Sequence, residues 1–172
     1  MSITVADLDG IPGRTAASLL VNCCGSSRWV SEMVAARPFG SRDAVFSEAD
    51  RIWTSLDASD WVEAFAHHPR IGERTAARSH GGQKDEWADE EQAGVGDADD
   101  NVRDALATSN QEYERRFGYI YIVCATGKTP EEMLELARRR LYNDGATELR
   151  LAAEEQRKIT RIRLQKLLEE EK

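Results

Sequence analysis

Only one stretch of the chain is typical of a β-strand, and it has no second strand to pair with. Residues 120–125, Ile-Tyr-Ile-Val-Cys-Ala, are rich in the β-branched and aromatic side chains that favour strands. Elsewhere, apolar residues recur at the three- and four-residue spacing of an α-helix. Because a strand needs a partner, we expect residues 120–125 to form a buried extended or short helical connector within an all-α chain.

Glycine, proline and helix-capping residues divide the helical pattern into segments. Thr129, Pro130 and Glu132 form a typical helix start, and Gly118 is placed to end the long helix before it. We expect a short lead over residues 1–10, a polar loop over 73–86, and a single-domain bundle of about seven to nine helices over 1–172. The predicted helices begin near Thr15, after Ser27, after Ser41 and at Asp57, and continue over 87–93, 98–117, 130–141 and from Thr147.

Charge and composition exclude several classes of protein. The 172 residues carry a net charge of −8, which argues against a general affinity for nucleic acid or for an anionic membrane. No apolar run approaches the roughly 18 residues of a membrane helix, and the first residues lack the features of a signal peptide. Three cysteines without a metal-binding spacing indicate a reducing compartment. We therefore expect a cytoplasmic protein.

Two of the three histidines stand together where a predicted helix must end. Pro69 pushes His68 towards an extended conformation, and Gly72 permits a turn soon afterwards. A histidine held at a rigid helix exit can face a cleft and act as an acid/base catalyst. Two histidines and a proline are also typical of an ordinary surface loop, so these residues alone leave both interpretations open.

Three polar side chains stand where the pattern gives them more than one interpretation. Arg163 falls in line with apolar residues of the last predicted helix, so it either extends its charge to water or meets an anion inside. Glu91 lies in a charged run that is either solvated or supplies a partner for a histidine. Asn110, at the edge of an apolar helix face, points either inward or to solvent.

Several short motifs occur together in a recognisable order, and the chain resembles the OHCU decarboxylase family (2-oxo-4-hydroxy-4-carboxy-5-ureidoimidazoline decarboxylase) of urate breakdown. The resemblance covers nearly the whole chain. It rests on Ser27-x-Trp29-Val30, Arg37-Pro38-Phe39, His68-Pro69-Arg70-Ile71-Gly72, Glu91-Gln92-Ala93-Gly94, Asn110-x-x-Tyr113-x-x-x-Phe117-Gly118-Tyr119, Ile122-Val123-Cys124-Ala125-x-Gly127-Lys128 and Glu148-x-x-x-Ala152-x-x-Glu155-x-x-Lys158-Ile159-x-x-x-Arg163-Leu164.

The resemblance implies an all-α enzyme that removes carbon dioxide from a small ureidoimidazoline substrate and forms (S)-allantoin. No metal or organic cofactor takes part, and family members are often homodimers. By position, His68 corresponds to the catalytic histidine, Glu91 to its acidic partner and Arg163 to the arginine that binds the ligand. The remaining substrate-binding positions that the resemblance implies are Pro69, Gln92, Phe117, Ile120, Ile122 and Val123.

The chain departs from the family pattern at Ala88, where a serine is common, so one pocket hydrogen bond is absent or is supplied by water. Two alternative functions compete with the decarboxylase. A metal-dependent hydrolase would use His67, His68 and His80, although adjacent histidines lack the usual helical ligand spacing. A non-enzymatic helical interaction module would have no pocket and no need for a buried arginine.

Overall fold

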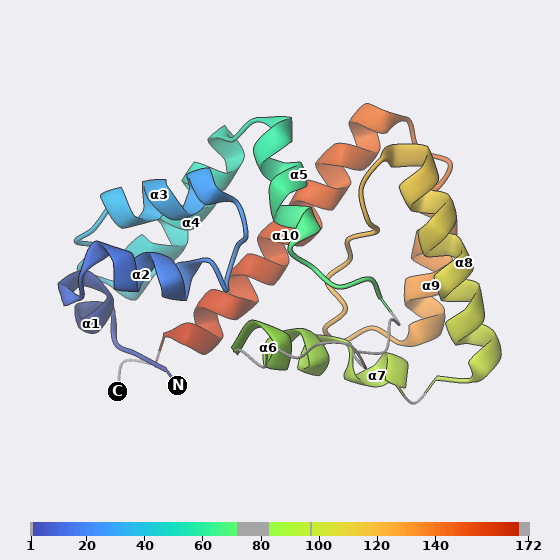
Figure 1. Cartoon of the computed structure of the whole chain (residues 1–172), viewed down its shortest axis with the longest axis horizontal. Coiled ribbons are helices and arrows are strands. Elements are labelled where there is room, and N and C mark those ends of the chain that lie inside the picture. Colours follow the sequence, from blue (N-terminus) through green and yellow to red (C-terminus); the bar gives the residue numbers. More distant parts are fainter. Residues whose placement is uncertain (1, 72–82, 97, 169–172) are drawn as a thin grey trace. The chain divides into compact units, whose positions relative to one another are not determined.

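In the computed structural model of the chain, residues 2–71, 83–96 and 98–168 are described. These residues contain ten α-helices and no β-strand, which confirms the predicted all-α class (Figure 1). The helices are α1 Val5–Gly10, α2 Gly13–Leu20, α3 Ser27–Ala35, α4 Arg42–Ser55, α5 Ala58–Ala66, α6 Gln83–Glu91, α7 Ala93–Gly96, α8 Asp100–Phe117, α9 Pro130–Arg140 and α10 Gly145–Leu167.

Three local differences from the sequence prediction have simple physical causes. The expected lead contains α1, because Thr4 caps it and forms a capping box with Asp7. The predicted loop 73–86 is wrong at its end, where α6 begins at Gln83. This first turn is polar and therefore shows no apolar periodicity. The rest of that loop, including His80, lies outside the described residues. A third difference is that residues 94–96, predicted to end a helix, form α7.

The chain divides into two compact units, each described separately below. Unit 1 comprises residues 1–64 and 156–172. Within it, α3 packs against α2 and α4, and the indole N–H of Trp29 donates to the carbonyl of Ala49 at 3.1 Å. Ser41 caps α4 as predicted, because its hydroxyl accepts a hydrogen bond from the backbone N–H of Ala44 at 3.2 Å. Buried apolar side chains from these helices form the core of this unit.

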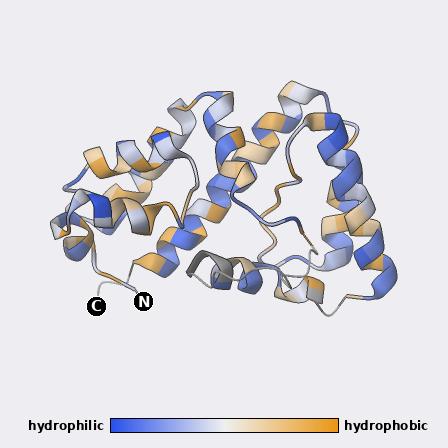
Figure 2. Cartoon of the chain, in the orientation of Figure 1, coloured by the Kyte–Doolittle hydropathy of each residue, from blue (hydrophilic) through white to orange (hydrophobic). Residues whose placement is uncertain are grey.

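Unit 2 comprises residues 65–155 and contains α6 to α9 together with the first part of α10. Helices α8 and α9 pack side by side (Figure 1). Figure 2 shows hydrophilic and hydrophobic residues interspersed along α8, as expected of a helix that buries one face. The capping box predicted at Thr129 and Glu132 starts α9, and Gly118 ends α8 at a φ of 82°. Between these helices, residues 119–125 form no regular structure, as predicted for a connector.

Candidate functional site

His68 follows directly on the end of α5. Its backbone N–H donates to the carbonyl of Phe65 at 3.1 Å, which continues the turn of the helix past Ala66. His68 and Pro69 are half-buried, whereas His67 is exposed. Of these two adjacent histidines, His68 is therefore the one that is partly enclosed.

Helix α8 holds the segment that follows His68. The Nδ2 group of Asn110 donates to the carbonyl of Ile71 at 2.9 Å, and Asn110 is 4% exposed. Arg70 forms an ion pair with Glu114 one helical turn further along α8, with Nη2 3.1 Å from Oε2. Of the two interpretations of Asn110, the inward orientation is therefore correct. The residues after His68 are anchored twice to one helix, which restricts the backbone that carries the imidazole.

Glu91 is the last residue of α6, and Gln92 follows in the turn to α7. Both side chains are half-buried, so the charged run is not uniformly solvated. The pKa of the Cys124 thiol is raised, chiefly by burial, and the charge of Glu91 contributes to the increase. The carboxylate of Glu91 therefore acts electrostatically on the connector that contains Cys124.

A shared hydrophobic cluster in unit 2 brings three predicted site segments together. Ile71 follows the His68 segment, Val95 follows Glu91 and Gln92, and Tyr121 and Val123 belong to the connector. Partly buried Phe117 packs against the same cluster. Three segments that are far apart in the sequence therefore contribute to one core, each through a residue in or next to the predicted site positions.

The connector uses its carbonyl groups within the protein. The carbonyl of Ile122 accepts a hydrogen bond from Arg140 Nη1 at 2.6 Å, and the carbonyl of Cys124 accepts one from Lys128 Nζ at 2.8 Å. Ile122 is 2% and Val123 is 5% exposed. Within the described part of the chain, no hydrogen bond engages the N–H groups of residues 121–123. Buried backbone N–H groups require partners, so these donors are suited to a bound ligand.

A buried polar network lies behind the connector. The Nε of Arg140 donates to Glu148 Oε1 at 2.7 Å, and Nη2 lies 2.5 Å from the same oxygen. Tyr113 donates its hydroxyl proton to Oε1, and Asn143 donates to Oε2 at 3.0 Å. Burial lowers the pKa of Arg140, but the interactions with Glu148 and the tyrosines outweigh this effect, so the pKa rises. Arg140 remains charged inside the core.

Arg163 belongs to unit 1 and lies on the buried stripe of α10, as its spacing predicted. The side chain is 2% exposed, so it does not extend its charge to water. Its Nη1 donates to the carbonyl of Asn22 at 3.2 Å. Burial raises the pKa of the neighbouring Cys23, and the charge of Arg163 lowers it in part. A buried guanidinium of this kind is suited to charge-assisted binding of an anion.

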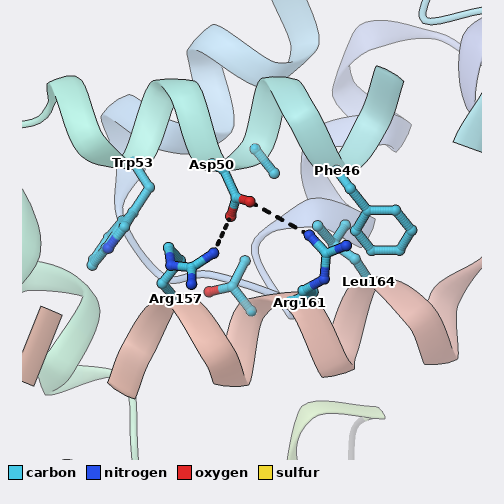
Figure 3. A pocket seen from close by; sticks show the side chains of 8 residues that line it. Phe46, Asp50, Trp53, Arg157, Arg161 and Leu164 are labelled. Atoms are coloured by element: carbon cyan, nitrogen blue, oxygen red, sulfur yellow. Dashed lines mark hydrogen bonds and ion pairs between the residues drawn. The ribbon is translucent and has the colours of Figure 1, made fainter. Parts of the chain in front are cut away.

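Unit 1 also contains a pocket between α4 and the last part of α10 (Figure 3). The carboxylate of Asp50 lies 3.2 Å from Arg157 Nη1 and 3.4 Å from Arg161 Nη1. The Arg161 guanidinium also lies over the ring of Phe46, 4.8 Å from its centre. Because these charges pair with one another, we interpret the pocket as packing between the two helices. Its lining residues are Phe46, Ala49, Asp50, Trp53, Arg157, Thr160, Arg161 and Leu164.

Comparison with known proteins identifies the family. The family model described as OHCU decarboxylase matches residues 10–165. The chain belongs to the OHCU decarboxylase family. It is 34% identical to the Arabidopsis thaliana uric acid degradation bifunctional protein TTL over 145 residues, which are 84% of this chain and 45% of that protein.

Two further matches cover most of the other protein's length. The 2-oxo-4-hydroxy-4-carboxy-5-ureidoimidazoline decarboxylase of Haloferax volcanii is 28% identical over 142 residues, 80% of each protein. A crystal structure of OHCU decarboxylase in the presence of (S)-allantoin is 33% identical, with a TM-score of 0.73 over 86% of this chain and 94% of that one. In contrast, the chain spans less than half the length of the bifunctional relatives it matches.

The structure shows where the departure from the OHCU decarboxylase family pattern at position 88 lies. Ala88 is 3% exposed on α6, one turn before Glu91, so a methyl group is buried where a serine is common.

Among the described residues, no group of three or more His, Cys, Asp or Glu side chains is placed to hold a metal ion. None of the helices described is both long and apolar enough to cross a membrane.

Sequence reasoning missed Arg140 and Glu148, although both carry a detectable signal. Arg140 follows Met133 and Ala137 at helical spacing, and Glu148 precedes Ala152 on the stripe that also contains Arg163. A charged residue in line with an apolar stripe is the signal that identified Arg163. The same signal in two adjacent helices predicts a buried ion pair.

Proposed function

We propose that this chain catalyses the cofactor-independent decarboxylation of 2-oxo-4-hydroxy-4-carboxy-5-ureidoimidazoline to (S)-allantoin in urate breakdown. The family match over residues 10–165 carries the proposal. The geometry of unit 2 supports it, because the segments of His68 and Glu91 and a connector with open N–H groups share one core. The enzyme is accordingly a carbon–carbon lyase acting on a small molecule.

Each residue of the proposed site has a distinct task. Arg163 binds an anionic group of the substrate through charge-assisted hydrogen bonds, which contribute about 1.5–3 kcal/mol each. Glu91 accepts a hydrogen bond from His68 and fixes the orientation and tautomer of the imidazole. The other substrate-binding residues in this proposal are Pro69, Gln92, Phe117, Ile120, Ile122 and Val123.

The chemical step breaks the bond between the ring carbon and the carboxylate. The bonding electron pair stays on the ring as an enolate-like species, and carbon dioxide leaves. Open N–H groups in residues 121–123 are placed to stabilise such developing charge. His68 then manages the proton that neutralises the ring, with a contribution of about 10²–10⁴-fold. Delivery of the proton to one face accounts for a single enantiomer.

The decisive experiment generates the unstable substrate in situ from urate and follows circular dichroism for (S)-allantoin. We expect the purified chain to accelerate the appearance of the (S) signal above the spontaneous reaction, which gives racemic product. An unchanged rate with racemic product would refute the proposed function.

The role of His68 has a matched control in the adjacent residue. We expect His68→Ala to remove the rate enhancement, because no other described imidazole continues the α5 turn beside Pro69. His67→Ala should retain wild-type turnover, because His67 is exposed. Far-UV circular dichroism checks that both variants fold. Near-normal turnover in His68→Ala would contradict the assignment.

The cysteines and the family resemblance support two further proposals, a cytoplasmic location and a homodimer. All three cysteines are buried free thiols, which fits a reducing cytoplasm. Family resemblance supports a homodimer, and light scattering after size-exclusion chromatography measures the mass directly.

Elemental analysis tests the alternative of a metal-dependent hydrolase, in which purified active protein would contain stoichiometric zinc or iron.

A further inference from the structure

We infer that Arg140 is a positioning residue that fixes the direction of the Val123 backbone N–H, so that this group stabilises negative charge on the substrate. The inference rests on the proposed function and assigns a role to a residue outside the proposed site. It depends on three features of unit 2: the hydrogen bond to the connector, the rigidity of Arg140, and the planarity of the peptide bond.

The hydrogen bond from Arg140 acts on the peptide that joins Ile122 to Val123. Arg140 Nη1 lies 2.6 Å from the carbonyl oxygen of Ile122. A trans peptide is planar, so its C=O and N–H point in opposite directions. With the carbonyl directed at Arg140, the N–H of Val123 must point away from Arg140. One side chain thereby sets the orientation of a donor that it does not touch.

Arg140 is itself held on several sides. Its Nε and Nη2 both face Glu148 Oε1, at 2.7 and 2.5 Å. Its guanidinium lies over two aromatic rings, 4.9 Å from the centre of Tyr121 and 5.8 Å from that of Tyr113. The side chain is 8% exposed, so it lacks the freedom of a surface arginine. The carbonyl of Ile122 is therefore bound by a fixed donor.

The geometry requires the fork of an arginine. One edge of the guanidinium binds the carboxylate, while Nη1 reaches the Ile122 carbonyl. A lysine ammonium has a single nitrogen and a different reach, so it cannot reproduce this planar arrangement. Arg140→Lys retains the positive charge of the network but loses the link that orients the peptide.

This orientation matters for rate because a donor that is already aligned needs no reorganisation when charge develops. Loss of one such donor lowers kcat by about 10²–10³-fold in well-studied sites. A donor that acts on the transition state affects kcat more than KM. Since Arg140→Lys misaligns the Val123 N–H and does not remove it, we expect a decrease in kcat of about 10–100-fold with KM within about twofold.

The test compares Arg140→Lys with Arg139→Lys in the coupled assay for (S)-allantoin. Arg139 is the preceding residue and pairs with Glu135, but its side chain is 70% exposed, so its replacement should leave both constants unchanged. A wild-type kcat in a folded Arg140→Lys variant would overturn the inference, while an inactive wild-type chain would instead refute the proposed function. If Arg140→Lys does not fold, Tyr113→Phe, which removes one hydrogen bond to Glu148, replaces it. A smaller decrease in kcat at constant KM supports the inference, and an unchanged kcat overturns it.

A second readout does not depend on turnover. In two-dimensional ¹H–¹⁵N NMR spectra, (S)-allantoin should shift the amide resonance of Val123 in the wild-type chain and in Arg139→Lys. The shift should be lost or much reduced in Arg140→Lys. The positioning role is contradicted if (S)-allantoin does not shift the Val123 resonance in the wild-type chain. It is also contradicted if the shift in Arg140→Lys is as large as in the wild-type chain.

Discussion

Replacement of Glu148 by glutamine should destabilise the chain far more than a comparable change on the surface. Glu148 is fully buried and accepts hydrogen bonds from Tyr113, Arg140 and Asn143. Glu148→Gln leaves the Arg140 guanidinium without its counter-charge, and the new amide N–H₂ faces groups that are themselves donors. Removing one partner of a buried ion pair costs about 3–5 kcal/mol. For a chain of this size, such a loss lowers Tm by about 6–20 °C.

Glu135→Gln is the matched control, because it removes the same charge from an ion pair on the surface of α9. The side chains of Glu135 and Arg139 are 63% and 70% exposed. Exposed helical pairs of this kind contribute about 0.3–0.5 kcal/mol. Urea unfolding followed by far-UV circular dichroism gives both free energies of unfolding under identical conditions. If Glu148→Gln loses no more stability than Glu135→Gln, the network does not hold the core as described.

Two further predictions concern other buried polar groups. Asn110→Leu removes the donor to the Ile71 carbonyl and should lower the free energy of unfolding by about 1–3 kcal/mol in urea, whereas no change would show that Asn110 does not anchor the segment after His68. Burial raises the pKa of Cys23 and raises that of Cys24 to about 12, while an unfolded thiol ionises near pH 8.5. Above about pH 8.5 the unfolded chain therefore binds fewer protons than the native one, and stability should fall by about 1.4 kcal/mol per pH unit for each thiol. Urea unfolding across this range should show a shallower decrease in Cys24→Ala, and an identical slope would contradict the assignment.

Much of the fold could be predicted because its signals are local. Pro130 with its capping box, Ser41 and Gly118 mark helix boundaries through backbone chemistry that needs no distant partner. The start of α6 at Gln83 was missed because polar helix-forming residues carry no apolar periodicity. Residues 83–86 are all polar, so they offer no apolar position from which a helix could be recognised in a single sequence.

In the candidate site, too, a local sequence pattern predicts some residues, whereas others depend on tertiary contacts. Arg163 was predicted to lie on a buried stripe because its helix is long enough to define one. Arg140 ends a shorter helix whose first turn is acidic and whose last turn is basic, with Arg138 and Arg139 beside it. Such a pattern complements the helix dipole and by itself explains a terminal arginine. The spacing from Met133 and Ala137 sets Arg140 apart from its exposed neighbours, but the tertiary position of Glu148 is needed to show which charge it meets.

The connector explains how an all-α chain can offer backbone donors to a ligand. Inside a helix each N–H is used by a carbonyl four residues earlier, and in a sheet it is used by a neighbouring strand. Residues 120–125 have the composition of a strand but no partner strand, and Arg140 and Lys128 bind the Ile122 and Cys124 carbonyls instead. Side chains thus satisfy the acceptors while the donors of residues 121–123 stay open among the described residues. Under the proposed function, this separation of donors from acceptors is what allows an irregular segment to bind a developing negative charge.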